Sequence, residues 1–303
     1  MDEADLTADA AQRLADAVER LCHRAGAGSP RSSTVLLPYS GEQGDAVRRT
    51  LKVLAPRMGV PALYGGDSRG PNIRWRDGAR CLLLDSGEAG GRESALRLTS
   101  HTTDALEQRE RVLFEQGVGD GDGQLPAYAD LPVLWQLHRD AAAAPPPLPP
   151  CVAPDWERLE ESLRTLMLAW ATQLPSQAAG GSAGFDVVNH ADGDRPLTFL
   201  YGPEDGLVVM VDDEDAAPDD VAHEQEMAAR GWHDRAIPVA RWWVSGFDAD
   251  ASGAAATARL AVAELRARGA RRPSDLGVAD ITCTDVAGEE IGRLTLPGLG
   301  LSG

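Results

Sequence analysis

The chain has 303 residues, of which 43% are hydrophobic and 25% are charged, and its formal net charge at pH 7 is −18. This composition excludes wholesale disorder, and the length favours two domains over one. The negative charge would repel nucleic acid and anionic membranes, so we expect neither as a partner.

The sequence carries no signal for export or membrane insertion. No apolar run approaches the roughly 18 residues that a membrane span needs, and the acidic start MDEADLTADA lacks the features of a signal peptide. Cys22, Cys81, Cys151 and Cys283 are scattered singly, which indicates neither a zinc site nor a disulfide framework. We therefore expect a cytoplasmic protein with free thiols.

In residues 1–140, apolar spacing predicts alternating helices and strands. They are a helix at 5–25, a strand at 34–37, a helix that carries Val47, Leu51 and Leu54 and ends at Pro56, strands at 73–75, 81–85 and 95–99, a helix at 104–116 capped by Thr103, and a strand at 131–138. Residues 61–70 are rich in turn formers. The run Leu82-Leu83-Leu84 predicts a strand that is covered on both faces.

Two motifs in this half suggest ligand sites but lack residues or spacings that nucleotide-binding and calcium-binding loops require. Gly41 and Gly44 precede a helix, yet their spacing fits neither dinucleotide nor P-loop motifs. Asp120 and Asp122 alternate with glycines, but the closing Glu of a calcium loop is absent. We expect structural roles for both motifs.

The proline-rich stretch at 141–150, AAAAPPPLPP, divides the chain. Its prolines cannot sustain a helix or a sheet ladder and favour an extended polyproline conformation. We expect a semi-rigid spacer between an α+β domain of unknown role at 1–140 and a second α+β domain at 151–303.

The second half repeats the pattern of helices and antiparallel strands. The predicted elements are a helix at 155–173 with Asp155 as its N-cap, strands at 185–189, 197–201 and 207–211, a helix at 219–230, a strand with Trp242 and Trp243, a helix at 252–268, and a final segment at 280–284 and 290–296 that forms a terminal hairpin or an ordered tail. The fold class is therefore α+β, with two domains that each contain an antiparallel meander packed with helices.

The stretch from Met227 to Phe247 carries the clearest functional signal. Gly231 can close the preceding helix because glycine accepts a positive φ, which would turn Trp232 back against that helix. Trp242 and Trp243 point to opposite faces of their strand, so one of them faces something other than the main core.

Catalytic and metal-binding signatures are missing. The six histidines belong to no recognisable spacing signature, and HEQEM lacks the second histidine of HExxH. The acidic residues at 212–215 and 219–220 favour the following helix N-terminus rather than a metal. We expect no catalysis, no cofactor and no metal.

The order of elements in 151–303, with Ala229-Arg230-Gly231-Trp232 and Arg241-Trp242-Trp243-Val244, resembles the TY-Chap group. These are peptide-binding chaperones related to type III secretion chaperones and to YbjN-like proteins. The resemblance implies an open sheet face or groove that holds an amphipathic segment of another protein, without cofactor or catalysis.

We therefore expect a bacterial, chaperone-like peptide-binding protein with a protein or peptide client. The expected contact residues are Trp242, Trp243, Phe199 and Tyr201. A homodimer is also compatible with the sequence. Two alternatives stay open: an immunity or antitoxin-like protein that masks one toxin, and an enzyme whose active site follows no recognised motif.

Overall fold

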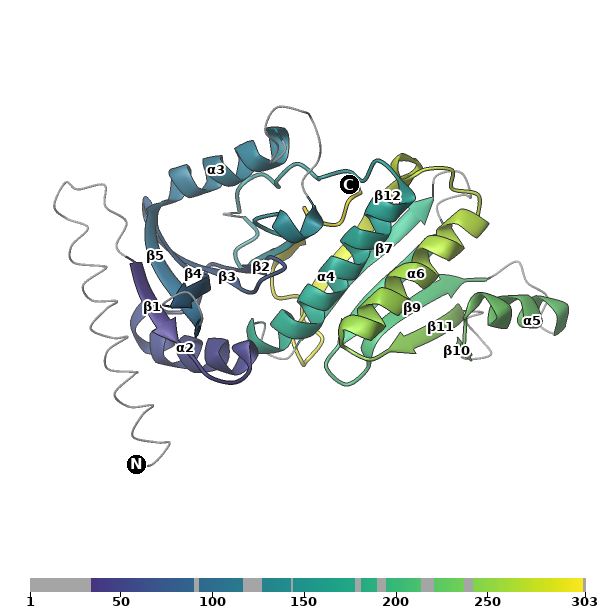
Figure 1. The fold of residues 1–303 in the computed structure, drawn as a ribbon, viewed down its shortest axis with the longest axis horizontal. Helices are drawn as coiled ribbons and strands as arrows, with labels where there is room; N and C mark the ends of the chain where they lie inside the picture. Colours follow the sequence, from purple (N-terminus) through teal and green to yellow (C-terminus); the bar gives the residue numbers. More distant parts are fainter. Residues whose placement is uncertain are drawn as a thin grey trace.

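The computed structural model describes residues 34–89, 93–116, 127–142, 144–177, 181–189, 195–213, 221–236 and 242–301. The helix expected at 5–25 and the loop at 117–124 lie outside these ranges, as does most of the acidic run at 212–220. Within them, the chain is an α+β protein with two antiparallel sheets and five α-helices (Figure 1).

The helices are α2 (Gln43–Met58), α3 (Thr103–Gln116), α4 (Trp156–Gln177), α5 (Val221–Arg230) and α6 (Ala251–Ala267). The first sheet has the strand order β1-β5-β4-β3-β2-β6-β13, with β1 (Thr34–Pro38), β2 (Leu63–Gly66), β3 (Asn72–Asp77), β4 (Arg80–Ala89), β5 (Glu93–Thr102), β6 (Trp135–His138) and β13 (Arg293–Thr295). The second has the order β10-β11-β9-β8-β7-β12, with β7 (Ser182–Asn189), β8 (Pro196–Gly202), β9 (Gly206–Asp212), β10 (Asp234–Ala236), β11 (Trp242–Phe247) and β12 (Leu276–Thr284).

Helices cover both faces of the first sheet. Leu82 and Leu84 belong to the main hydrophobic core, on the side of α2 and α4. Leu83 points the other way and packs with Cys81 and with Leu106 of α3. The prediction that this strand is covered on both faces is confirmed.

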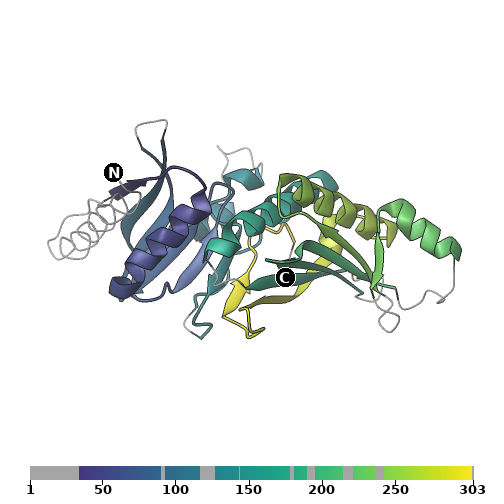
Figure 2. The ribbon, with the colours of Figure 1, turned by 90° about the horizontal axis from the view of Figure 1, so that it is seen from below.

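The second sheet has α4 and α6 on one face (Figure 2). Phe185 and Phe199 stack there with ring centroids 4.7 Å apart, and Trp170 of α4 meets the Phe185 ring edge-on at 5.6 Å. Ala258 and Ala261 are fully buried on α6, and their small side chains let that helix approach the sheet closely.

Helix α4 joins the two halves of the molecule. It packs against α2 and β2 on one side and against α6, β8 and β9 on the other. One continuous cluster of buried apolar side chains therefore runs through both sheets. The division of the chain into domains at 1–140 and 151–303 stays a prediction.

The final segment forms the start of the predicted hairpin and then crosses to the first sheet, which the sequence does not predict. After a tight turn that brings Glu290 opposite Thr284, the chain leaves the second sheet and adds β13 to β6 of the first sheet. Leu294, Leu296 and Leu299 are buried in the shared core. Burial of these leucines explains why the segment crosses to the other sheet.

Several boundaries differ from the sequence prediction. The helices α2 and α4 continue past Pro56 and Pro175, because a proline in the last turns removes only one backbone hydrogen bond. The turn-rich stretch at 61–70 contains the buried strand β2, and the strand expected at 131–138 shortens to β6. Asp155 does cap α4, since its Oδ1 accepts from the Arg158 N–H at 2.9 Å.

The proline segment, residues 145–150, lies against the first half of the chain. Arg111 of α3 donates to the carbonyl oxygens of Pro146 and Pro147 at 3.1 and 3.3 Å, and Arg293 of β13 donates to that of Pro145. The segment therefore lies along the first half of the chain, and its role as a semi-rigid spacer between two domains stays a prediction. None of the helices in the described ranges is long and apolar enough to span a bilayer.

Candidate peptide-binding face

The Gly-Trp turn after α5 forms as its sequence predicts. Gly231 has a φ of 102°, and the Trp232 backbone N–H donates to the Met227 carbonyl at 3.1 Å. This turn directs the Trp232 side chain into the core, where its Nε1–H donates to Oε2 of Glu264 at 3.0 Å. Trp232 is therefore a structural residue of the α5–α6 junction.

Trp242 and Trp243 lie on opposite faces of β11, as alternation predicts. Trp243 is 5% exposed, and its Nε1–H donates to Oδ2 of Asp213 at 2.8 Å. The same oxygen lies 2.8 Å from Nε2 of His223. Trp242 is half-buried on the face away from the helices.

Phe199 and Tyr201 are core residues rather than contact residues. They are 0% and 2% exposed, and burial raises the pKa of the Tyr201 hydroxyl. Together with Trp243 they lie on the sheet face that the helices cover, so these three residues do not meet solvent. The expectation of a contact surface made by all four aromatic residues is corrected: only Trp242 lies on the uncovered face.

The uncovered face of the second sheet is apolar at its centre. In the described part of the chain, α4 and α6 lie on one side of this sheet and no helix lies on the other (Figure 2). We call this surface the open face; its half-buried apolar residues are Val188, Leu200, Val208, Met210, Trp242 and Val244. Direct cross-strand pairs join them, Leu200 opposite Val208 and Met210 opposite Val244.

Acidic residues border the open face. At its described positions on β7, β8, β9 and β11, the charged residues are Asp186 and Asp212. Burial raises the pKa of the Asp186 carboxyl, with a smaller contribution from the neighbouring Asp280, and Thr198 donates to its Oδ1 at 2.6 Å. The open face therefore combines an apolar centre with negative charge.

Sequence reasoning missed most of the open face, although a signal was present. The strands LTFLYG and GLVVMVD are apolar at nearly every position, whereas a strand with one solvated face normally alternates. Leu200, Val208 and Met210 are the residues that break the alternation. When helices cover only one face of a sheet, a strand of that sheet that is apolar at every position exposes apolar side chains on the uncovered face. Such a surface is typical of a binding site for a partner.

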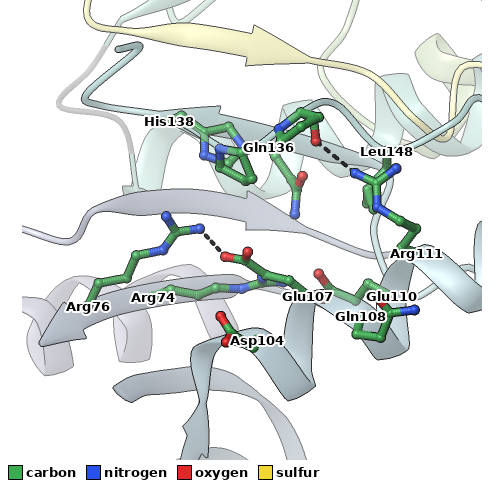
Figure 3. A pocket seen from close by; sticks show the side chains of 12 residues that line it. Arg74, Arg76, Asp104, Glu107, Gln108, Glu110, Arg111, Gln136, His138 and Leu148 are labelled. Carbon is green, nitrogen blue, oxygen red and sulfur yellow. Dashed lines mark hydrogen bonds and ion pairs between the residues drawn. The ribbon is translucent and has the colours of Figure 1, made fainter. Parts of the chain in front are cut away.

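A separate polar pocket lies under α3 on the first sheet (Figure 3). Its lining includes His138 as well as the carboxylates of Glu107 and Glu110, a combination that would favour the enzyme alternative. However, no hydrogen bond joins the His138 ring to a carboxylate among the described residues, and burial lowers the pKa of this histidine to about 4. A neutral imidazole held by its surroundings suits ligand binding better than proton transfer near neutral pH.

No protein-family model, curated protein or solved structure matches the chain. In the described residues, no group of three or more His, Cys, Asp and Glu side chains is placed to hold a metal ion.

Proposed function

We propose that the protein is a non-catalytic binding module that holds an amphipathic segment of a client protein on the open face. One observation carries this proposal: strands β8, β9 and β11 carry apolar side chains on both faces of the sheet, yet helices cover only one face. A contiguous apolar patch on a sheet is a typical protein-interaction site.

The energetics favour burial of this face by a partner. Each Å² of apolar surface removed from water contributes about 25 cal/mol before the entropy cost of association. Trp242 is the largest side chain available for contact, and tryptophan is enriched among residues that dominate binding energy. A client segment that covers Met210, Val244 and Trp242 would place its own apolar side at the centre of the patch.

The charge of the surface selects the chemistry of the client. Asp186 and Asp212 border the apolar centre, and the whole chain has a net charge of −18. A client that is apolar on one side and basic on the other is attracted by both features. Its association should weaken as ionic strength rises.

The resemblance of 151–303 to the TY-Chap group supports the same proposal. A sheet with helices on one face and an open apolar face is the arrangement that this resemblance implies. The chaperone-like reading requires several clients of similar chemistry, whereas the immunity or antitoxin-like alternative requires one tight partner. Competition between unrelated amphipathic peptides separates the two.

The test uses the full chain and a fluorescent synthetic peptide of leucine and arginine, arranged to be apolar on one side, with a scrambled isomer as control. Anisotropy should detect tighter binding of the amphipathic isomer. Val244→Asp should weaken it at least about 10-fold, the loss expected for a contact at the centre of an interface. Val286→Asp, on a loop where the valine is 81% exposed, is the matched control. Equal binding of both isomers, or unchanged binding by a folded Val244→Asp variant, would contradict the proposal.

A further inference from the structure

The polar pocket has the size of a small-molecule site. Its volume is about 390 Å³, and its walls come from β3, β6, α3 and the proline segment (Figure 3). Pockets that hold small ligands fall in this range. It belongs to the first sheet and shares no residue with the open face.

Two side chains of β6 point into the pocket with unused hydrogen-bonding capacity. Gln136 and His138 are each 5% exposed, and neither side chain has a hydrogen-bond partner within the described ranges. Burial, with the nearby guanidinium groups of Arg293, Arg76 and Arg74, lowers the pKa of His138 to about 4. Its ring is therefore neutral at pH 7, and it offers one donor and one acceptor.

The charged groups of the pocket form two ion pairs between β3 and α3. Arg74 is 1% exposed, pairs with Glu110 and donates from Nε to Oδ1 of Asn72 at 2.8 Å, so this ion pair is buried and held by a neighbouring amide. Arg76 pairs with Glu107, but this pair is more exposed and the Arg76 Nε is buried without a partner. Arg76 and Glu107 are therefore the pair that a ligand can reach.

The strand wall of the pocket is positive, and the helix wall carries most of the negative charge. Arg74 and Arg76 lie on the strand, whereas the carboxylates of Asp104, Glu107 and Glu110 lie on the helix. The helix also carries Arg111, whose guanidinium donates to the carbonyl oxygens of Pro146 and Pro147. No partner of the Asp104 carboxylate is found among the described residues. A ligand bound between these walls meets guanidinium groups on one side and carboxylates on the other.

We infer that the polar pocket binds a small zwitterion, a free aliphatic amino acid, with its carboxylate toward Arg76 and Gln136 and its ammonium toward Asp104 and Glu107. Such a ligand replaces the Arg76–Glu107 pair with two pairs of its own, so no buried charge is left without a partner. Arg74 and Glu110 remain as the fixed framework.

The remaining wall selects the side chain of the ligand. Pro145, Pro146 and Leu148 give the pocket an apolar surface, held in place by Arg111. The described residues that line the pocket include no Trp, Tyr or Phe on which a nucleobase or sugar ring could stack. A lone anion would face the helix carboxylates and a lone cation the arginines. A zwitterion with an aliphatic side chain can pair its carboxylate with the strand arginines and its ammonium with the helix carboxylates, and can place its side chain against the proline wall.

The first experiment is calorimetric titration of the full chain with each common aliphatic L-amino acid, accompanied by thermal unfolding. At saturating ligand, at least one should give a binding isotherm and raise Tm by about 2 °C or more. L-Leucinamide and N-acetyl-L-leucine, which keep the side chain but carry one charge each, should bind at least about 10-fold more weakly than leucine. No heat and no Tm shift with any of these amino acids, or equal binding of the singly charged analogues, would overturn the inference.

A variant pair then locates the site. Asp104→Asn removes a carboxylate that has no partner among the described residues, so it should weaken zwitterion binding about 5-fold or more while Tm stays unchanged. Asp77→Asn, at the exposed end of β3 outside the pocket, is the matched control. Unchanged affinity in a folded Asp104→Asn variant would place the ligand elsewhere and refute the assignment. Val244→Asp should leave this binding intact, so the test is independent of the open face.

Discussion

The indole N–H of Trp232 donates to Oε2 of Glu264 at 3.0 Å, and both residues are almost completely buried. Nη1 of Arg230 approaches the same oxygen at 3.5 Å. Burying the Glu264 carboxylate without such partners would cost free energy of folding. The contact fixes the turn after α5 to the last turn of α6.

Removing that carboxylate should destabilise the whole fold. We expect Glu264→Ala to lower the free energy of unfolding by roughly 2–4 kcal/mol, because it leaves the Trp232 N–H and Arg230 without their buried acceptor. Glu226→Ala, which breaks the exposed i,i+4 pair with Arg230, should cost less than about 1 kcal/mol. Urea denaturation of both variants measures the difference; equal losses would contradict the structural role of Glu264.

The two faces of the second sheet should respond differently to truncation. Phe199→Ala removes a fully buried ring stacked on Phe185 and should cost roughly 3–5 kcal/mol. Trp242→Ala acts on the open face and should cost less than half of that, roughly 1–2 kcal/mol, because its side chain is only half-buried. Guanidinium denaturation provides the comparison. A larger loss for Trp242 would show that the open face is covered in the free protein.

The last strand should be necessary for the fold of both halves. Deleting residues 290–303 removes four buried leucines, Leu294, Leu296, Leu299 and Leu301, each worth roughly 2–5 kcal/mol, which exceeds the total stability of a typical protein. We expect the truncated chain to lose cooperative thermal unfolding. Deleting only 302–303 is the control. An isolated 151–303 fragment should also fail to fold, since it lacks β6; a cooperative transition in that fragment would support independent domains.

The free energy of unfolding should decrease as the pH is lowered, within a window set by the unfolded and folded pKa values of His138. The unfolded chain protonates this residue near its usual pKa of 6.5, while the folded state keeps it neutral down to about 4. Within that window the unfolded state binds more protons, so stability decreases as the pH is lowered, by roughly 1–3 kcal/mol after allowance for solvent screening. Other groups titrate in the same range, so the measurement is the difference in urea midpoints between wild type and His138→Gln. Parallel pH profiles for the two proteins would refute the assignment.

The sequence predicts local elements well because their signals are local. Apolar spacing identifies α2 and α6, short apolar runs between turn residues identify the strands of both meanders, and Gly231 marks the end of α5. Two predictions that concern side chains are also confirmed: the strand with Leu82, Leu83 and Leu84 is covered on both faces, and Trp242 and Trp243 lie on opposite faces of β11.

Long-range relationships could not be predicted in the same way. Nothing near Arg293–Thr295 indicates that this strand pairs with β6, because the partner lies in the other half of the sequence. The polar pocket was missed for a similar reason, although Asn72, Arg74 and Arg76 alternate with apolar residues in NIRWRD. Their burial depends on α3, whose carboxylates approach only in the folded chain.

The pairing of β6 with β13 also has a consequence for biosynthesis. Thr295 hydrogen-bonds to Gln136 across 159 positions of sequence, so a ribosome must add all of these residues before the first sheet can be completed. During that interval β6 presents an unpaired edge, which is a template for strands of other nascent chains. Slow translation of the second half should therefore favour aggregation of the emerging chain, so the yield of folded protein should depend on the speed of elongation as well as on the stability of the finished fold.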